Sequence, residues 1–247
     1  MTALDEIRAA HEGGDHELVL RLTDAALARR PGDDAAHEYR ARALLALDRP
    51  DEAEQHAQDA VRLDPDEVRY RELLARVLSQ QGAHRDAAAE FARLARNDPR
   101  QTTWTLAEAQ ERLGASQPAM GLEAARRAVR LEPRSGQAQL ALSQALARTG
   151  DARGAFQAAG AATRLLGGLP EAREALADAR WLGNDDAAAF NEFQALAREL
   201  RGADADRIIA KANTLYRQHA GMAGRLVAGI GPLFAFALRR GWVRVGA

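Results

Sequence analysis

The stretch "VRLDPDEV", residues 61–68, decides the fold of this chain because it returns, with changes, at a fixed interval. Its proline, Pro65, lies 34 residues after Pro31 and 34 residues before Pro99, and Pro133 follows at the same distance. The stretches around the other three prolines are "LARRPGDD" (27–34), "LARNDPRQ" (94–101) and "VRLEPRSG" (129–136). Proline ends a helix and biases the preceding residue away from helical geometry. A fixed period of this size indicates an array of stacked structural repeats.

Small residues recur in the same register between these prolines. Midway through the first half of a repeat they are Ala41, Ala75, Ser143 and Ala177, and early in the second half they are Ala53, Ala87, Gly121, Ala155 and Ala189. The turn between the halves carries Gly14, Gly82 and Gly150, and the last repeat has Gly183 and Asn184 there. Two antiparallel helices approach closely only where both present small side chains, and larger residues interlock on either side. The pattern therefore predicts a pair of close-packed helices in each repeat.

These positions together resemble the tetratricopeptide repeat family, in which each repeat is a helix–turn–helix unit closed by a proline. The resemblance implies an all-α fold, a right-handed superhelical solenoid of about six repeats. We expect the repeats near 1–33, 34–67, 68–101, 102–135, 136–169 and 170–203. Stacked repeats need a terminal element that covers the last apolar face. We assign this role to a capping helix at 204–220, which is followed by an apolar C-terminal tail at 221–247.

The fourth repeat departs from this pattern. Gly114 comes two residues earlier than the turn glycine of the other repeats, and "GASQPAMG" (114–121) includes and follows it. Either the first helix starts at Arg100, which places the Leu106–Ala107 pair at the close-packing position, or the turn carries an extra loop. Both alternatives predict a local irregularity between residues 100 and 121, of the kind that surface turns tolerate.

In tetratricopeptide repeat proteins the first helices line a concave groove that holds an extended or helical peptide, and the resemblance implies the same role here. The expected groove residues are Glu38, Arg42, Arg69, Glu72, Arg76, Trp104, Glu108, Arg112, Gln144 and Arg148. Further positions on the same face are Gln137, Leu140, Glu174, Asp178 and Trp181. Trp104 is either an anchor for the ligand or a packing residue.

Three Glu–Arg pairs on this face have the four-residue spacing of helix-surface ion pairs. They are Glu38–Arg42, Glu72–Arg76 and Glu108–Arg112. The pairs fit either a solvated face that they stabilise or a mixed-charge groove whose arginines bind the carboxylates of a ligand. One subclass of the family clamps a C-terminal carboxylate with Lys and Asn in the groove. Arg42 and Arg76 stand at those positions here, with no Lys or Asn, which argues against that particular function.

The tail contains thirteen residues without a charge, "LVAGIGPLFAFAL" (226–238). A membrane-spanning helix needs about 20 apolar residues, and Gly229, Gly231 and Pro232 interrupt this run, so a simple anchor is disfavoured and two short helices are expected. Three interpretations of the tail stay open. It folds back on the capping helix and the last repeats, it docks on another copy or a partner, or it lies at a membrane surface. The expected contact residues are Leu226, Ile230, Leu233, Phe234, Phe236, Leu238 and Trp242.

Composition argues against most kinds of chemistry. The formal net charge of −1 gives no reason to expect nucleic acid as a partner, and the absence of cysteine excludes thiol chemistry and thiolate metal sites. The six histidines are scattered along the helices, and we find no pair with a carboxylate partner at metal-site spacing. No nucleophile, phosphate-loop or dinucleotide motif is present. We therefore expect no catalysis, no metal and no cofactor.

The leading hypothesis is a non-enzymatic scaffold or adaptor that binds a protein or peptide in its groove. Charged residues and the lack of an apolar run in the first twenty positions are unlike a signal peptide, which predicts a cytoplasmic location. The alternative is a self-assembling or membrane-peripheral structural protein that forms homo-oligomers, or contacts a membrane, through its tail.

Overall fold

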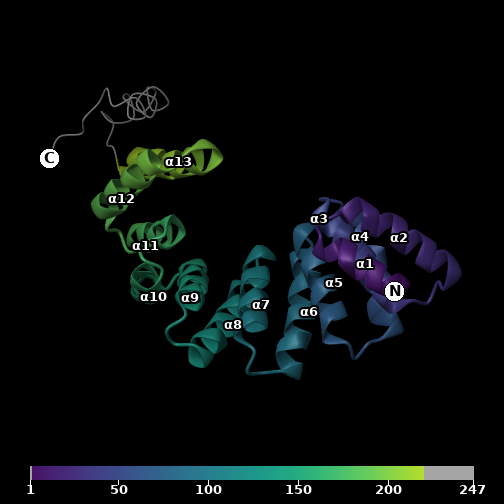
Figure 1. Cartoon of the computed structure of the whole chain (residues 1–247). Coiled ribbons are helices and arrows are strands. Elements are labelled where there is room, and N and C mark those ends of the chain that lie inside the picture. The colour runs from purple at the N-terminus through teal and green to yellow at the C-terminus, as the bar shows by residue number, and fades with distance from the viewer. Residues whose placement is uncertain (1, 220–247) are drawn as a thin grey trace. The chain divides into compact units, whose positions relative to one another are not determined.

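The computed structural model describes residues 2–219, and within this range the chain forms thirteen α-helices and no strand (Figure 1). The first helices of the repeats are α1 (Ala3–Glu12), α3 (Asp34–Ala46), α5 (Val68–Gln80), α7 (Thr102–Gly114), α9 (Gly136–Arg148) and α11 (Pro170–Leu182). The second helices are α2 (His16–Arg29), α4 (Pro50–Leu63), α6 (His84–Asn97), α8 (Pro118–Leu131), α10 (Ala152–Leu165) and α12 (Asp186–Glu199), and α13 (Gly202–His219) follows them. The expected all-α repeat fold is confirmed.

The described chain divides into two compact bodies, one with helices α1–α8 that ends at Leu131 and one that begins at Glu132. Within each body every helix contacts the next one along the chain. First helices also contact one another directly, α1 with α3, α3 with α5, and α9 with α11. Each body therefore has a face made by its first helices, joined by α13 in the C-terminal body, which we call the first-helix face.

The turn between the two helices of each repeat has one residue in the left-handed region at the same position in all six repeats. These residues, with φ between 57° and 85°, are Gly14, Asp48, Gly82, Ser116, Gly150 and Asn184. The next residue donates its N–H to the carbonyl five positions back, as Asp15 does to Ala10 at 3.0 Å and Asp151 does to Leu146 at 3.0 Å. This is the bond that closes a helix at a left-handed C-terminal residue.

Repeat four shares this geometry, so the prediction of a local irregularity between residues 100 and 121 is wrong. Its first helix starts at Thr102, and its turn residue is Ser116 rather than Gly114. Gln117 donates to the carbonyl of Arg112 at 2.8 Å, as in the other turns. Gly114 is simply the last residue of α7, and the close-packing position of the repeat is occupied by Ala109, whose exposed fraction is 0%.

The helices of a repeat cross where small residues meet. Ala41, Ala75, Ala109, Ser143 and Ala177 are all buried, and so are their second-helix counterparts Ala53, Ala87, Gly121, Ala155 and Ala189. A β-carbon at Gly121 would lie 3.0 Å from Cδ2 of Leu113, which is tighter than most real contacts. Ser143 keeps its hydroxyl at this crossing because its Oγ donates to the carbonyl of Ala155 at 3.0 Å. Burial of its polar group is thereby compensated.

Helix α13 packs on the last repeat through Ile208, Ala212 and Leu215, which join Phe193 and Leu196 of α12 in one apolar cluster. It starts two residues before the expected position 204. No helix within the described residues is long and apolar enough to cross a membrane. The tail and all of its expected contact residues lie outside the described residues.

The left-handed turn position offers a direct test of the register. Gly82→Ala should lower the free energy of unfolding by about 1 kcal/mol, because a β-carbon disfavours positive φ. Space is not the cause, since no atom lies within 4 Å of the added β-carbon. Ser116→Gly should raise the free energy of unfolding for the same reason. Chemical denaturation measures both, with Gly32→Ala as the control, because Gly32 lies in a turn without a positive φ.

Candidate functional site

The first-helix face of the N-terminal body contains a hollow of about 480 Å³ between α1, α3 and α5, which we call the N-terminal hollow. Its lining residues are His11, Arg42, Leu45, Ala46, Arg69, Glu72, Leu73 and Arg76. Four of the predicted groove residues, the three arginines and Glu72, therefore lie together. Three arginines and one glutamate line the hollow, and the arginines pair with Glu38, Glu67 and Glu72.

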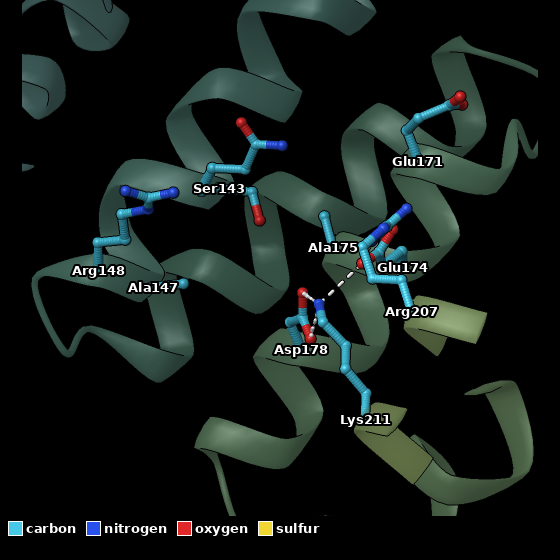
Figure 2. A pocket seen from close by; sticks show the side chains of 10 residues that line it. Ser143, Ala147, Arg148, Glu171, Glu174, Ala175, Asp178, Arg207 and Lys211 are labelled. Carbon is cyan, nitrogen blue, oxygen red and sulfur yellow. Dashed lines mark hydrogen bonds and ion pairs between the residues drawn. The ribbon is translucent and has the colours of Figure 1, made fainter. Parts of the chain in front are cut away.

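The C-terminal body has a corresponding hollow of about 400 Å³ between α9, α11 and α13, which we call the C-terminal hollow (Figure 2). Its lining residues are Ser143, Gln144, Ala147, Arg148, Glu171, Glu174, Ala175, Asp178, Arg207 and Lys211. Most of these positions repeat those of the N-terminal hollow three repeats further along the chain. Arg42 and Arg76, for example, correspond to Gln144 and Asp178. The backbone thus forms the same hollow twice, and the side chains give each hollow its own charge.

A buried glutamate supports each hollow from the same position of its repeat. Glu38 and Glu174 have exposed fractions of 2% and 9%. Glu38 lies 3.4 Å from a guanidinium nitrogen of Arg69 on the next first helix, and Glu174 accepts a hydrogen bond from Arg207 of α13. A buried carboxylate is stable only with such partners, so each glutamate fixes a cation at the rim of its hollow.

The arginines of the N-terminal hollow are paired but still reach solvent. Arg42 donates from Nε to Glu38 at 2.9 Å, and Arg76 donates to Glu72 at 2.6 Å. Their side chains are 35% and 60% exposed. The Arg76–Glu72 pair is solvated and contributes little to stability, about 0–1 kcal/mol, so exchanging Glu72 for a ligand carboxylate is energetically accessible. Glu38 is buried, so Arg42 stays paired with it and presents only its exposed part to a ligand.

His11 brings a neutral ring to the edge of the same hollow. Burial, followed by the positive charge of Arg42, lowers the pKa of His11 below its ordinary value of 6.5. Its ring packs edge-on against Tyr39, with ring centroids 5.4 Å apart. The hollow thus offers an uncharged aromatic surface beside its guanidinium groups at neutral pH.

In the C-terminal hollow, Lys211 lies between two carboxylates (Figure 2). Its Nζ is 2.6 Å from Oδ2 of Asp178 and 2.8 Å from Oε1 of Glu174. Burial raises the pKa of Asp178 above its ordinary value, although the hydrogen bond from Lys211 opposes this change. Three basic and three acidic side chains line this hollow, so it lacks the positive excess of the N-terminal one.

Two groove residues predicted for repeat four lie elsewhere because the register assumed there was wrong. Glu108 is 6% exposed and accepts a hydrogen bond from Arg127 of α8 at 2.6 Å, so it faces its own second helix. Arg112 lies 3.9 Å from Glu108 and donates to Gln117 at 2.7 Å. Trp104 is partly buried against Ala75, Phe91 and Leu94, which is a packing environment.

Sequence reasoning missed the residues that adjoining helices bring to the site. Arg207 and Lys211 were assigned to a cap, yet they complete the C-terminal hollow. His11 and Leu45, which stand one period apart, also line the N-terminal hollow, and neither was predicted. His56 and Asp59 have the three-residue spacing of one helical face, but His37 lies on another helix, so a search for a histidine pair on one face could not find this group.

Glu38 and Glu72, the glutamate partners of Arg42 and Arg76, should respond differently to loss of charge. Glu38→Gln should lower the free energy of unfolding by about 1–3 kcal/mol, because a buried carboxylate that accepts a hydrogen bond from Arg42 and pairs with Arg69 loses its charge. Glu72→Gln, the matched control, should cost less than about 1 kcal/mol since that pair is solvated. Urea denaturation of both variants measures the difference, and equal losses would contradict the structural role of Glu38.

Comparison with known proteins places this geometry among repeat proteins. A family model described as "Tetratricopeptide repeat" matches residues 4–68, 40–102 and 106–170. No curated protein matches the chain.

Solved structures share the fold at low identity. A tetratricopeptide repeat protein from Parabacteroides merdae is 12% identical with a TM-score of 0.71, and 96% of each chain is covered. A MamA RS-1 double mutant is 18% identical with a TM-score of 0.61, covering 67% of this chain and 96% of its own. YrrB, described as "a TPR protein with an unusual peptide-binding site", is 16% identical with a TM-score of 0.54, covering 80% of this chain and 93% of its own.

Proposed function

We propose, since this chain belongs to the tetratricopeptide repeat family, that it is a non-enzymatic scaffold which binds a segment of another protein on its first-helix face. Proteins of this family generally act as interaction scaffolds, and no catalytic family is indicated. One of the structural neighbours, YrrB, is described as having a peptide-binding site.

The observation that carries the proposal is the hollow formed twice at equivalent positions. Small residues are repeated at the helix crossings, where packing requires them. The residues at the rim of the hollows change instead: Arg42 and Arg76 stand where the C-terminal body has Gln144 and Asp178. A constant backbone with changing side chains lets each hollow bind a segment of different chemistry.

The charge of the N-terminal hollow favours a segment that carries carboxylates. Arg42, Arg69 and Arg76 line it, and Arg69 and Arg76 have side chains that are 52% and 60% exposed. Arginine donates two parallel hydrogen bonds to a carboxylate. Leu45 and Leu73 add apolar surface beside these groups. We therefore propose an acidic segment with an apolar side chain as the ligand of this hollow.

The test is a selection of displayed peptides on the purified chain, followed by fluorescence anisotropy with the enriched sequences. We expect enrichment of peptides with Asp or Glu next to an apolar residue. Arg42→Glu with Arg76→Glu should weaken their binding at least tenfold, or by about 1.4 kcal/mol. Binding should also weaken as salt screens the exposed charges.

The matched control reverses two exposed arginines on a second helix, Arg85→Glu with Arg96→Glu on α6. This variant changes the net charge by the same amount and leaves the hollow intact. It should bind the peptides like the unchanged chain. Equal binding by the Arg42/Arg76 variant and by the unchanged chain would refute the proposed site.

A further inference from the structure

One pair of positions joins the first helix of a repeat to its second helix through side chains. In repeat three Arg71 of α5 donates to Glu90 of α6 at 2.8 Å, and in repeat six Arg173 of α11 donates to Glu192 of α12 at 2.6 Å. Repeat two has histidines at both positions. Nδ1 of His37 on α3 lies 2.9 Å from Nδ1 of His56 on α4. Two imidazoles thus replace an ion pair.

The carbonyl of the closing proline determines where His37 carries its proton. Nε2 of His37 lies 2.9 Å from the carbonyl oxygen of Pro31. At the same position of the next repeat, Arg71 donates to the carbonyl of Pro65 at 3.2 Å. A carbonyl oxygen only accepts hydrogen bonds, so Nε2 of His37 is protonated. Its Nδ1 is left with a lone pair that points toward His56. A metal-binding histidine commonly has its second nitrogen bonded in this way.

Asp59 provides a third ligand atom one helical turn from His56. Its Oδ2 lies 3.9 Å from Nδ1 of His37, and one ligand atom from each of the three residues lies within 4.8 Å of the other two. Arg62 bonds the other carboxylate oxygen, Oδ1, at 2.9 Å and so orients the group. His37 is only 7% exposed, while His56 and Asp59 are partly exposed, which gives a cation a route from solvent.

We propose that His37, His56 and Asp59 bind a divalent transition-metal ion such as Zn²⁺. Zinc bonds nitrogen and oxygen at about 2.1 Å in a tetrahedral arrangement, which requires ligand atoms about 3.4 Å apart. The separations of 2.9 and 3.9 Å lie on either side of this value, so small side-chain rotations suffice. Two imidazoles and one carboxylate leave a fourth position for water.

Arg40 opposes the metal. Its Nε donates to Nε2 of His56 at 2.9 Å, so the proton of that ring is on Nδ1, between the two histidines. Binding requires that Nδ1 of His56 release its proton and that a proton occupy Nε2, which leaves the ring neutral. The hydrogen bond from Arg40 is then lost. Arg40 keeps its ion pair with Asp24 and its hydrogen bond to the carbonyl of Leu20. This competition should lower the affinity for the metal without abolishing it.

The site lies one residue from Glu38 and joins α3 to α4. A metal bound there would stabilise the repeat that carries Glu38 and Arg42. It would do so whether or not the first-helix face binds a peptide, so the two proposals fail independently. Ligands that bind the folded state alone raise its apparent stability.

The experiment uses Zn²⁺ alone with the untagged full chain, followed by isothermal titration and thermal unfolding. His37→Arg with His56→Glu copies the ion pair of repeat three, so this variant should fold and should lose the zinc site. We expect one zinc site in the unchanged chain, a Tm that rises with Zn²⁺, and neither effect in the double variant. His84→Gln is the control, because His84 also faces a carboxylate, that of Glu111 at 2.8 Å, and should leave the site unchanged.

Arg40→Leu tests the role assigned to Arg40, since leucine stands at this position in repeats three, five and six, as Leu74, Leu142 and Leu176. It should bind Zn²⁺ about tenfold more tightly, because groups beside a ligand change metal affinity by about 10–100-fold and this substitution removes the hydrogen bond that competes for His56. Equal zinc binding by the unchanged chain and the His37/His56 variant would overturn the proposal. Unchanged or weaker binding by Arg40→Leu would overturn the proton arrangement on which it depends.

Discussion

A methyl group added at Gly121 would stand 3.3 Å from the carbonyl oxygen of Ala109, and the rest of the structure depends on such close approach of paired helices. Ala41, Ala75 and Ala177 occupy the position of Ala109 in other repeats, and their exposed fraction is 0%. Close approach admits only small side chains and sets the rotation of each helix about its axis. That rotation decides which residues face the second helix and which reach the first-helix face.

The first-helix face is a consequence of this constraint. Because each first helix has the same rotation, Arg42 and Arg76 recur at one height of successive helices and line one hollow. Glu38 and Glu174 are buried at one position for the same reason, and each pairs with a cation two helices further along the chain, on α5 and α13. The positions that carry charge are therefore fixed by packing, while the kind of charge is free to differ between the two bodies.

Much of the fold could be predicted from the closing prolines and the small residues, because each has a direct steric cause. Repeat four was misread because we expected glycine in its turn. Serine, aspartate and asparagine also occupy the left-handed position here, at Ser116, Asp48 and Asn184. The hollows were predicted only in part, since Lys211 and His11 belong to neighbouring repeats. The His37–His56 contact joins two helices, so no spacing within one helix reveals it.

The most direct measurement of this account compares the free energies of unfolding of Ala109→Leu and Ala107→Leu. Ala109 lies at the helix crossing with no exposed surface, whereas Ala107 is partly exposed. Overpacking a close-packed site costs about 1–3 kcal/mol, so the account predicts that loss for Ala109→Leu and a smaller one for Ala107→Leu. A larger loss for Ala107→Leu would contradict the register through repeat four and with it the constraint from which the first-helix face follows.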